Sequence, residues 1–185
     1  MKRQQKFNLL VIFAFISFPS FHMAFAKSFK VKTVSSVDLQ RYMGKWYEIA
    51  SYPQWFQKDC TASRATYELR EDGYVKVLNE CNLKEVDGKL KKAKGRAWVV
   101  DKSTNAKLKV QFFLPWVKLP FLAGDYWIIM LDKENYSYSV ISDPKKKTLW
   151  ILSRTKKMPE NLYQSILEKL RQRGFDLGKL KITKQ

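Results

Sequence analysis

The sequence has 185 residues, and its 35 lysine and arginine residues outnumber 17 aspartate and glutamate residues, so its net charge at pH 7 is +18. This length is typical of one domain, and so basic a surface favours anionic partners such as acidic ligands or phospholipid headgroups. No helix-turn-helix, zinc-finger or RNA-binding signature accompanies the charge, which excludes the common nucleic-acid-binding classes.

The first 26 residues have the pattern of a secretory signal peptide. Three basic residues precede an apolar run at 7–18, and Ala-Phe-Ala at 24–26 is typical of a cleavage site. The run is too short to favour a membrane-spanning helix, and no cysteine follows it for lipid attachment. We therefore expect residues 27–185 to form one exported domain, periplasmic or secreted. Removing the three basic residues lowers the net charge from +18 to +15.

Eight strand-like segments follow at short, regular spacing. A helical turn at 37–42, with Asp38 as its N-cap, precedes the first of them. Turn signals such as Asp-Gly and Asp-Pro separate the segments. Links of hairpin length predict an antiparallel up-and-down sheet, sandwich or barrel. The predicted strands cover 46–50, 62–69, 74–81, 95–101, 106–113, 126–131, 138–142 and 149–154.

One amphipathic helix is predicted near the C-terminus. A proline suits its first turn, and Gly174 is a natural stop just beyond it. Leu162, Ile166 and Leu170 form an apolar stripe along one face. We expect this helix, at about 159–173, to pack by that stripe against the outside of the sheet. Binding of a partner or a membrane by the stripe is the alternative.

Two cysteines, Cys60 and Cys81, lie beyond the signal peptide. In an oxidising compartment an even number of cysteines favours a disulfide. If Leu69 faces Val75 across the intervening turn, Ser63 faces Cys81, and Cys60 lies about three residues out of register. A bulge or splayed strand ends would have to close that gap, and two free thiols remain the alternative.

Gly44 and Trp46 begin the first strand, and Arg154 ends the last one. If these two strands meet, a buried Trp46 at the floor of a barrel needs a cover. A guanidinium over the indole face supplies one by cation–π contact, which is worth about 1–2 kcal/mol when desolvated. This spacing therefore predicts a sealed end of the barrel.

Catalytic chemistry finds little support. The single histidine, His22, lies in the predicted signal peptide, which removes histidine-based nucleophile and acid–base schemes and most zinc sites. No phosphate-binding or dinucleotide-binding glycine motif is present. Glu48 and Asp125 are the carboxylates that could be imagined as a pair, but Glu48 is more typical of a polar cluster on the first strand. We therefore expect no enzyme, no metal and no cofactor.

Together these features resemble the lipocalin family, in particular its branch of bacterial lipocalins and apolipoprotein D. The segments that carry the resemblance are 41–50, 65–67, 77–79, 108–110, 126–127 and 149–154. The resemblance spans about 38–181 and implies an all-β fold in which an eight-stranded antiparallel up-and-down barrel, at about 44–154, encloses one small apolar ligand. The helix would then pack outside the barrel. Bacterial relatives are often outer-membrane lipoproteins, but this chain lacks the acylated cysteine.

The resemblance also implies a ligand site. Tyr67, Asn79 and Trp127 would face the cavity, and the hairpin register independently places Tyr67, Val77 and Asn79 on one face. Tyr138 is a further candidate for contact with the ligand. Core packing remains the alternative for Trp127, and a hydrogen bond to a neighbouring strand remains the alternative for Asn79. Relatives of this branch bind fatty acids, lysophospholipids or other small lipophiles.

In a lipocalin, alternate links between the strands line the open mouth of the barrel. Here those links carry ten lysines against four acidic residues, a balance of +6, whereas the links at the closed end balance to −2. We expect this basic and apolar mouth to dock on an anionic membrane. The alternatives are that its aromatic residues fold down over the cavity or form a homodimer interface. The residues expected to face the membrane are Trp116, Phe121, Lys145, Lys146 and Lys147.

The function expected from all of this is a lipid-binding carrier, a monomer or homodimer that stores or transports a fatty acid or lysophospholipid in envelope maintenance. Two alternatives remain open. The protein could be an interaction protein that uses its basic mouth, or an isomerase of lipocalin fold that acts on a lipophile.

Overall fold

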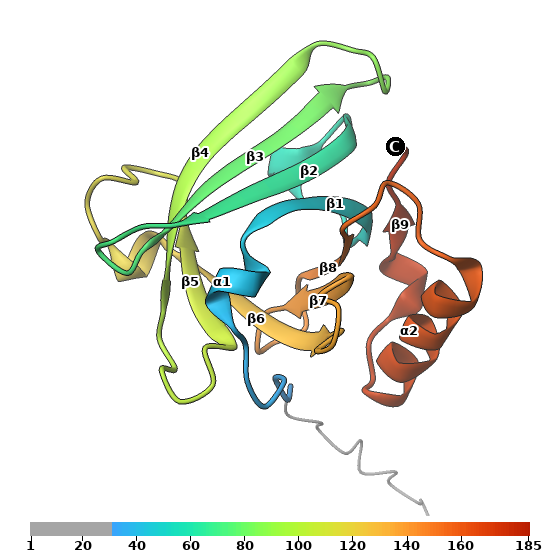
Figure 1. Cartoon of the computed structure of the whole chain (residues 1–185). Coiled ribbons are helices and arrows are strands. Elements are labelled where there is room, and N and C mark those ends of the chain that lie inside the picture. Colours follow the sequence, from blue (N-terminus) through green and yellow to red (C-terminus); the bar gives the residue numbers. More distant parts are fainter. Residues whose placement is uncertain (1–30) are drawn as a thin grey trace, which may run out of the picture.

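Nine antiparallel strands form one sheet in the computed structural model, which describes residues 31–185. The predicted signal peptide lies outside these residues. The strands are β1 (Gly44–Ser51), β2 (Cys60–Leu69), β3 (Val75–Leu83), β4 (Leu90–Val99), β5 (Lys107–Gln111), β6 (Gly124–Leu131), β7 (Tyr138–Ser142), β8 (Leu149–Ser153) and β9 (Lys181–Ile182). Each of β1 to β8 pairs with the next, and β8 pairs with β1, which closes the sheet (Figure 1). The predicted eight-stranded antiparallel barrel is therefore confirmed, with one extra strand.

Five helical segments accompany the strands among the described residues, and only one of them is longer than four residues. They are α1 (Leu39–Tyr42), η1 (Trp55–Gln57), η2 (Pro120–Leu122), α2 (Glu160–Gln172) and η3 (Leu177–Lys179). The Asp38 side chain accepts a hydrogen bond from the Arg41 amide, 3.1 Å away, and so caps α1 as expected. Helix α2 packs outside the barrel (Figure 1), and two residues of its apolar stripe, Ile166 and Leu170, are fully buried there.

Two apolar clusters account for the core. One fills the inside of the barrel around Trp46, Val77, Leu108 and Ile128. The other lies between the outer face of the barrel and α2. Strands β6, β7 and β8 are consequently covered on both faces, because each of them contributes side chains to both clusters.

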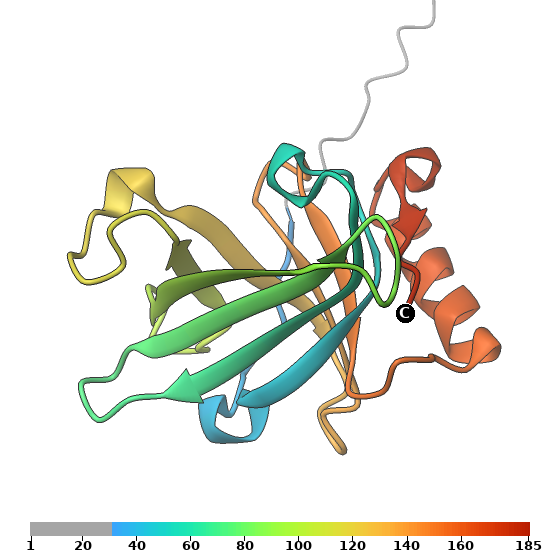
Figure 2. The same cartoon turned by 90° about the horizontal axis from the view of Figure 1, so that it is seen from above.

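The two ends of the barrel differ in what they carry. Figure 2 shows η1, η2 and the β7–β8 turn at one end, which we call the mouth, and α1 at the opposite end, which we call the floor. The floor also holds the β2–β3, β4–β5 and β6–β7 links. No helix among residues 31–185 has the length and apolar character needed to cross a membrane.

Strand boundaries differ from expectation mainly at the mouth. Strand β4 begins at Leu90, whereas the prediction began it at 95. The sequence did not reveal its first five residues as a strand, because all five are exposed and lack the alternation that marks a half-buried strand. Strand β5 ends at Gln111 rather than at 113. After Gln111 the chain turns into a loop. The Gln111 side chain donates to three carbonyls of that loop, those of Phe113, Leu114 and Val117, at 2.7, 3.0 and 2.9 Å.

Strand β9 was not predicted, and it completes the wall of the barrel at the mouth. Strands β1 and β2 pair only between Gly44 and Tyr47 on the β1 side. Beyond that point β9 pairs with Ala50 and Ser51 of β1. The Lys184 carbonyl accepts from the Ala62 amide of β2, 2.6 Å away. The C-terminal segment thus fills the seam between two strands that separate.

Candidate functional site

The inner face of β2 and β3 carries three of the residues predicted to contact a ligand. In the ladder Tyr67 lies opposite Val77, and Ala65 lies opposite Asn79. Asn79 in turn faces Ala93 of β4. Residues two apart on a strand share a face, so Asn79 points to the same side as the buried Val77. The expected grouping of Tyr67, Val77 and Asn79 on one face is therefore present.

Asn79 stands out because its side-chain oxygen is buried and has no hydrogen-bond partner among the described residues. Both of its cross-strand neighbours are alanines, which leave space around the amide. Ala93 is exposed, so solvent reaches this part of the interior. A buried polar atom without a partner is costly. The Asn79 oxygen is therefore available to accept a hydrogen bond from a donor that enters the barrel.

Tyr67 has a different setting from Asn79. Its hydroxyl lies 3.1 Å from the Tyr126 hydroxyl, and the Tyr126 hydroxyl lies 2.9 Å from that of Tyr42. Ser139 continues the chain, 3.0 Å from the Tyr42 hydroxyl. Burial raises the pKa of Tyr42 to about 12 and raises the pKa of Tyr67 and Tyr126 as well. These hydroxyls therefore form a neutral network in the barrel interior next to the floor. The sequence analysis did not identify Tyr126 as a member of it.

Below this network the floor is sealed. The Arg154 guanidinium carbon lies 3.7 Å from the centre of the Trp46 indole. Its nitrogens donate to the carbonyls of Lys45 and Arg41, at 2.9 and 2.8 Å. Gly44 adopts a φ of +91°, and a β-carbon there would lie 3.3 Å from Arg154. The contact between Trp46 and Arg154 that the sequence suggested is thus present, with Gly44 leaving room for it.

Trp127 and Tyr138 do not face the cavity, and that expectation is wrong. Both belong to the cluster between the barrel and α2. Their neighbours Ile128 and Ser139 point inward instead, since Ile128 lies in the interior cluster and Ser139 binds Tyr42. The Trp127 ring packs beneath the Lys107 ammonium, 5.2 Å from its centroid.

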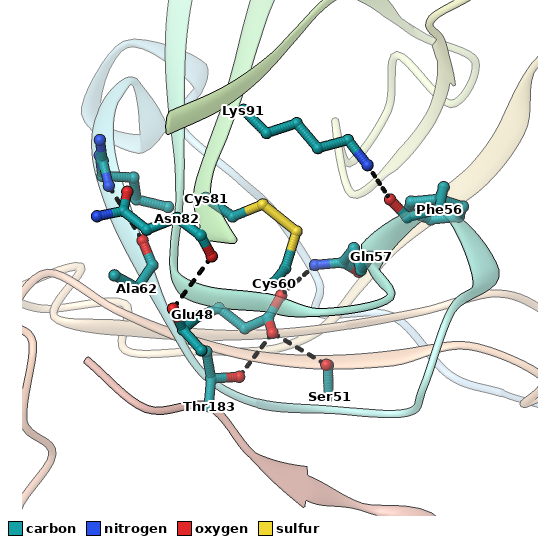
Figure 3. Close-up of a disulfide and its surroundings, with 12 residues drawn as sticks. Glu48, Ser51, Phe56, Gln57, Cys60, Ala62, Cys81, Asn82, Lys91 and Thr183 are labelled. Carbon is teal, nitrogen blue, oxygen red and sulfur yellow. Dashed lines mark hydrogen bonds between the residues drawn. A yellow bond between two sulfur atoms is a disulfide. The ribbon is translucent and has the colours of Figure 1, made fainter. Parts of the chain in front are cut away.

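A second polar network lies where β1 approaches the mouth. The Glu48 side chain is buried, and its carboxylate accepts from Ser51 Oγ, Thr183 Oγ1 and Gln57 Nε2 at 3.0, 2.6 and 2.8 Å (Figure 3). Gln57 Oε1 also accepts from the Trp150 indole N–H at 3.1 Å. Glu48 thus belongs to a polar cluster on the first strand. The cluster joins η1, β8 and the C-terminal segment.

The disulfide between Cys60 and Cys81 is confirmed and lies beside this network (Figure 3). Leu69 pairs with Val75 as expected, and the register shifts between Thr61 and Arg64. This bulge brings the two cysteine α-carbons to 5.4 Å, within the range that a disulfide requires. The bridge therefore ties the beginning of β2, directly after η1, to β3.

The mouth exposes several aromatic side chains. Trp55 is 88 % exposed, Phe121 is 80 % exposed and Trp116 is 73 % exposed. Trp116 belongs to a segment that folds back over the outer face of β4, where Arg96 donates to the Trp116 carbonyl at 3.2 Å. These side chains do not fold down over the cavity, so that alternative finds no support.

The lysines of the β7–β8 turn divide into two groups. Lys145 and Lys147 are exposed. Lys146 donates to the Arg173 carbonyl at 2.6 Å, and its ammonium lies 5.4 Å from the Phe175 ring centre, so it packs against the end of α2.

No group of three or more His, Cys, Asp or Glu side chains within residues 31–185 is arranged to hold a metal ion.

Comparison with known proteins agrees with this geometry. The model of the lipocalin-like domain family matches residues 37–185. Temperature-induced lipocalin-1 of Arabidopsis thaliana is 42 % identical, with 84 % of this chain and 83 % of the relative covered. The outer membrane lipoprotein Blc of Vibrio cholerae is 39 % identical over 84 % and 86 % of the two chains.

More distant proteins share the fold. Apolipoprotein D of Macaca fascicularis is 33 % identical, with 80 % of this chain and 77 % of the relative covered. Among solved structures, insecticyanin from the tobacco hornworm Manduca sexta superposes with a TM-score of 0.65 at 21 % identity, covering 84 % of each chain. Similarity thus extends over the barrel, α2 and the C-terminal segment.

Proposed function

This chain belongs to the lipocalin family, whose members bind small hydrophobic ligands, and we propose from this that it carries a fatty acid or lysophospholipid in its barrel. The ligand's chain would occupy the apolar interior, and its polar head would meet Asn79. The carrier would store or transport lipids for maintenance of the cell envelope. One observation supports the proposal most directly: the side-chain oxygen of Asn79 is buried and unpartnered beside Ala65 and Ala93 on the inner face of the barrel.

The ligand contacts in this proposal are narrower than those expected from the sequence. Val77 and Asn79 lie on the inner face of β3, whereas Tyr67 contributes its ring and leaves its hydroxyl to Tyr126. Trp127 and Tyr138 are left out because they pack under α2. A ligand contact known from the family can therefore be assigned to a residue of this chain only where that residue faces the barrel interior.

A binding role agrees with the charged groups as the structure pairs them. Asp125 forms an ion pair with Lys109 at 2.8 Å on the outer surface, and the Glu48 carboxylate is surrounded by neutral donors. The two carboxylates therefore do not form an acid–base pair. Since the predicted exported part of the chain contains no histidine, we propose a carrier rather than an enzyme.

The proposed location is the periplasm or the extracellular medium. The pattern of residues 1–26 supports export. Among the relatives, the Vibrio cholerae and Escherichia coli proteins are called outer membrane lipoproteins. The present chain has no cysteine directly after the predicted leader, so we propose that it reaches its lipids as a free protein and takes them from an anionic membrane.

Native mass spectrometry of gently purified protein tests the carrier role. We expect a co-purified lipid of defined mass, or uptake of added fatty acid or lysophospholipid. A protein that stays empty and takes up neither would overturn the proposal and favour an interaction role.

Two substitutions on one strand sharpen this test. Ala93 points into the barrel and Lys94 is its outward, exposed neighbour. Ala93→Trp should fill the space beside Asn79 and lower the lipid affinity by about tenfold or more, whereas Lys94→Trp should leave it nearly unchanged. Equal affinities in the two variants would place the ligand elsewhere.

The role of the amide has its own test. Asn79→Ala should weaken binding by about three- to tenfold, the usual worth of one hydrogen bond. Asn135→Ala, in an exposed link at the floor, is the matched control and should bind as the unmodified protein does.

A further inference from the structure

The turn that carries Trp55 is held firmly although Trp55 itself is almost fully exposed. The Phe56 carbonyl accepts from the Lys91 ammonium of β4 at 3.0 Å (Figure 3). The Gln57 side chain donates to Glu48 and accepts from Trp150. Three residues farther on, Cys60 is bridged to Cys81. Contacts from four different strands therefore fix this short helical turn.

The rigidity of η1 does not serve to bury Trp55. The Trp55 ring packs edge-to-face on Phe56, with ring centres 5.7 Å apart, and is 88 % exposed. On the other side of the mouth, Phe121 in η2 is 80 % exposed, and both helical turns lie at the same end of the molecule (Figure 2). Large aromatic side chains gathered at one end of a protein mark a surface that meets an apolar partner.

The charge around these aromatic residues identifies the partner. In the structure the links at the mouth carry seven lysines against four acidic residues, a balance of +3, and their lysines at 58, 84, 89, 145 and 147 are all exposed. Tryptophan and phenylalanine surrounded by lysine fit the interface of a membrane with anionic headgroups, where aromatic rings enter the headgroup region and lysines pair with phosphate. A second copy of this chain fits poorly, because a symmetric contact would bring two surfaces of the same positive charge together.

We infer that Trp55 and Phe121 are membrane anchors, which insert into an anionic leaflet and hold the mouth of the barrel against it. The inference rests on the proposed carrier function for its purpose, since a docked mouth would let a lipid pass into the barrel without crossing water. The docking surface consists of η1, η2 and the exposed lysines of the mouth links. Lys146 is excluded from this surface because it packs on α2.

Co-sedimentation with vesicles tests the docking surface. The purified protein should bind vesicles of phosphatidylcholine with phosphatidylglycerol and bind pure phosphatidylcholine vesicles far more weakly. Trp55→Ser combined with Phe121→Ser should lower binding to the mixed vesicles by about tenfold or more. The control is Val100→Ser, a 51 % exposed apolar residue just after β4 at the floor, and it should bind normally.

The charged part of the surface has a matched pair of variants. Lys58→Ser with Lys89→Ser removes two lysines from the mouth and should weaken binding by about fivefold or more. Lys102→Ser with Lys133→Ser removes the same charge from the floor and should have a smaller effect. Equal losses in the two pairs, or equal binding to neutral and anionic vesicles, would overturn the inference.

Quenching of tryptophan fluorescence by brominated lipids locates the anchor directly. The unmodified protein should lose fluorescence on mixed vesicles, and Trp55→Phe should lose much of that response while still binding. If the response persists, Trp55 does not insert.

Two further measurements separate membrane docking from the other roles of this surface. Lipid uptake from solution tests the carrier function, and light scattering measures the oligomeric state. The Trp55→Ser, Phe121→Ser variant should still take up lipid in solution, as measured by native mass spectrometry. A protein that docks on vesicles but never binds lipid would refute the carrier function and leave the docking surface standing. If the same variant turns a dimer into a monomer without affecting vesicle binding, the surface is a contact between copies and the inference fails.

Discussion

The floor and the mouth of this barrel use aromatic residues in opposite ways. At the floor, Trp46 is fully buried, its indole N–H donates to the Tyr42 carbonyl at 2.8 Å, and Arg154 covers its face. At the mouth, Trp55 is fixed by its neighbours yet remains exposed. The comparison indicates that the floor stabilises the fold, whereas the mouth is available for binding.

The largest effect is expected from Trp46. Trp46→Ala would leave a cavity beneath the tyrosine network and should lower the free energy of unfolding by about 3–5 kcal/mol. Denaturant unfolding followed by circular dichroism measures the change. Trp46→Phe, which keeps an aromatic ring under Arg154, is the control and should lose less. Equal losses would mean that the volume of the indole does not matter.

A high-pH experiment tests the tyrosine network. Burial raises the pKa of Tyr42 from the usual 10 to about 12, so the hydroxyl stays protonated in the folded protein while it ionises in the unfolded chain. Its stabilising contribution is fully present below pH 10 and is lost between pH 10 and pH 12, by about 3 kcal/mol. Urea unfolding at several pH values measures this loss, which should be smaller in Tyr42→Phe. A stability that does not change up to pH 12 would contradict the prediction.

Arg154 should affect stability without affecting binding. Arg154→Ala removes the cation–π contact and its hydrogen bonds to the carbonyls of Lys45 and Arg41, and should lower the free energy of unfolding by about 2 kcal/mol. The lipid affinity should remain within a few-fold. Arg154→Lys keeps the charge but not the planar fork, so an intermediate melting temperature is expected. A large loss of lipid affinity at unchanged stability would place the ligand near the floor.

The smallest change in stability is expected at the mouth. Trp55→Ser should shift the free energy of unfolding by no more than about 0.5 kcal/mol, because an exposed side chain contributes little to the core. Thermal unfolding of this variant, compared with Val100→Ser, checks the prediction. A shift as large as that of Arg154→Ala would mean that η1 is part of the folded core and that its exposure serves no separate purpose.

Several parts of the structure could be predicted because the local pattern was unambiguous. The Asp-Gly turn set the pairing of Leu69 with Val75, and that register placed Tyr67, Val77 and Asn79 on one face. The same register left Cys60 out of line. The bulge near Ala62, whose φ is +46°, was therefore an expected requirement of the disulfide, and it is present.

Trp127 shows why other parts could not be predicted. Strand β6 is apolar on both faces, because its inner face meets the barrel interior and its outer face meets α2. The alternation of apolar and polar residues therefore does not indicate which side chains of β6 face the interior and which face α2. The register also shifts between Ile128 and Met130, which changes the parity within the strand. A tryptophan in such a strand can be placed only when the helix that covers it is known.

The sequence by itself determined eight antiparallel strands, an amphipathic helix after them and the strand ends that carry Trp46 and Arg154, because periodicity, turn residues and matching strand ends are local or depend on simple register. The closed barrel was expected from the resemblance to the lipocalin family, and the disulfide was favoured over two free thiols. Only the tertiary structure decided which residues reach the interior, that Lys146 packs on α2, and that residues 181–185 close the seam between β1 and β2. These outcomes depend on which surfaces cover one another. A short segment such as β9 acquires its structure from the unpaired strand edges it meets rather than from its own residues.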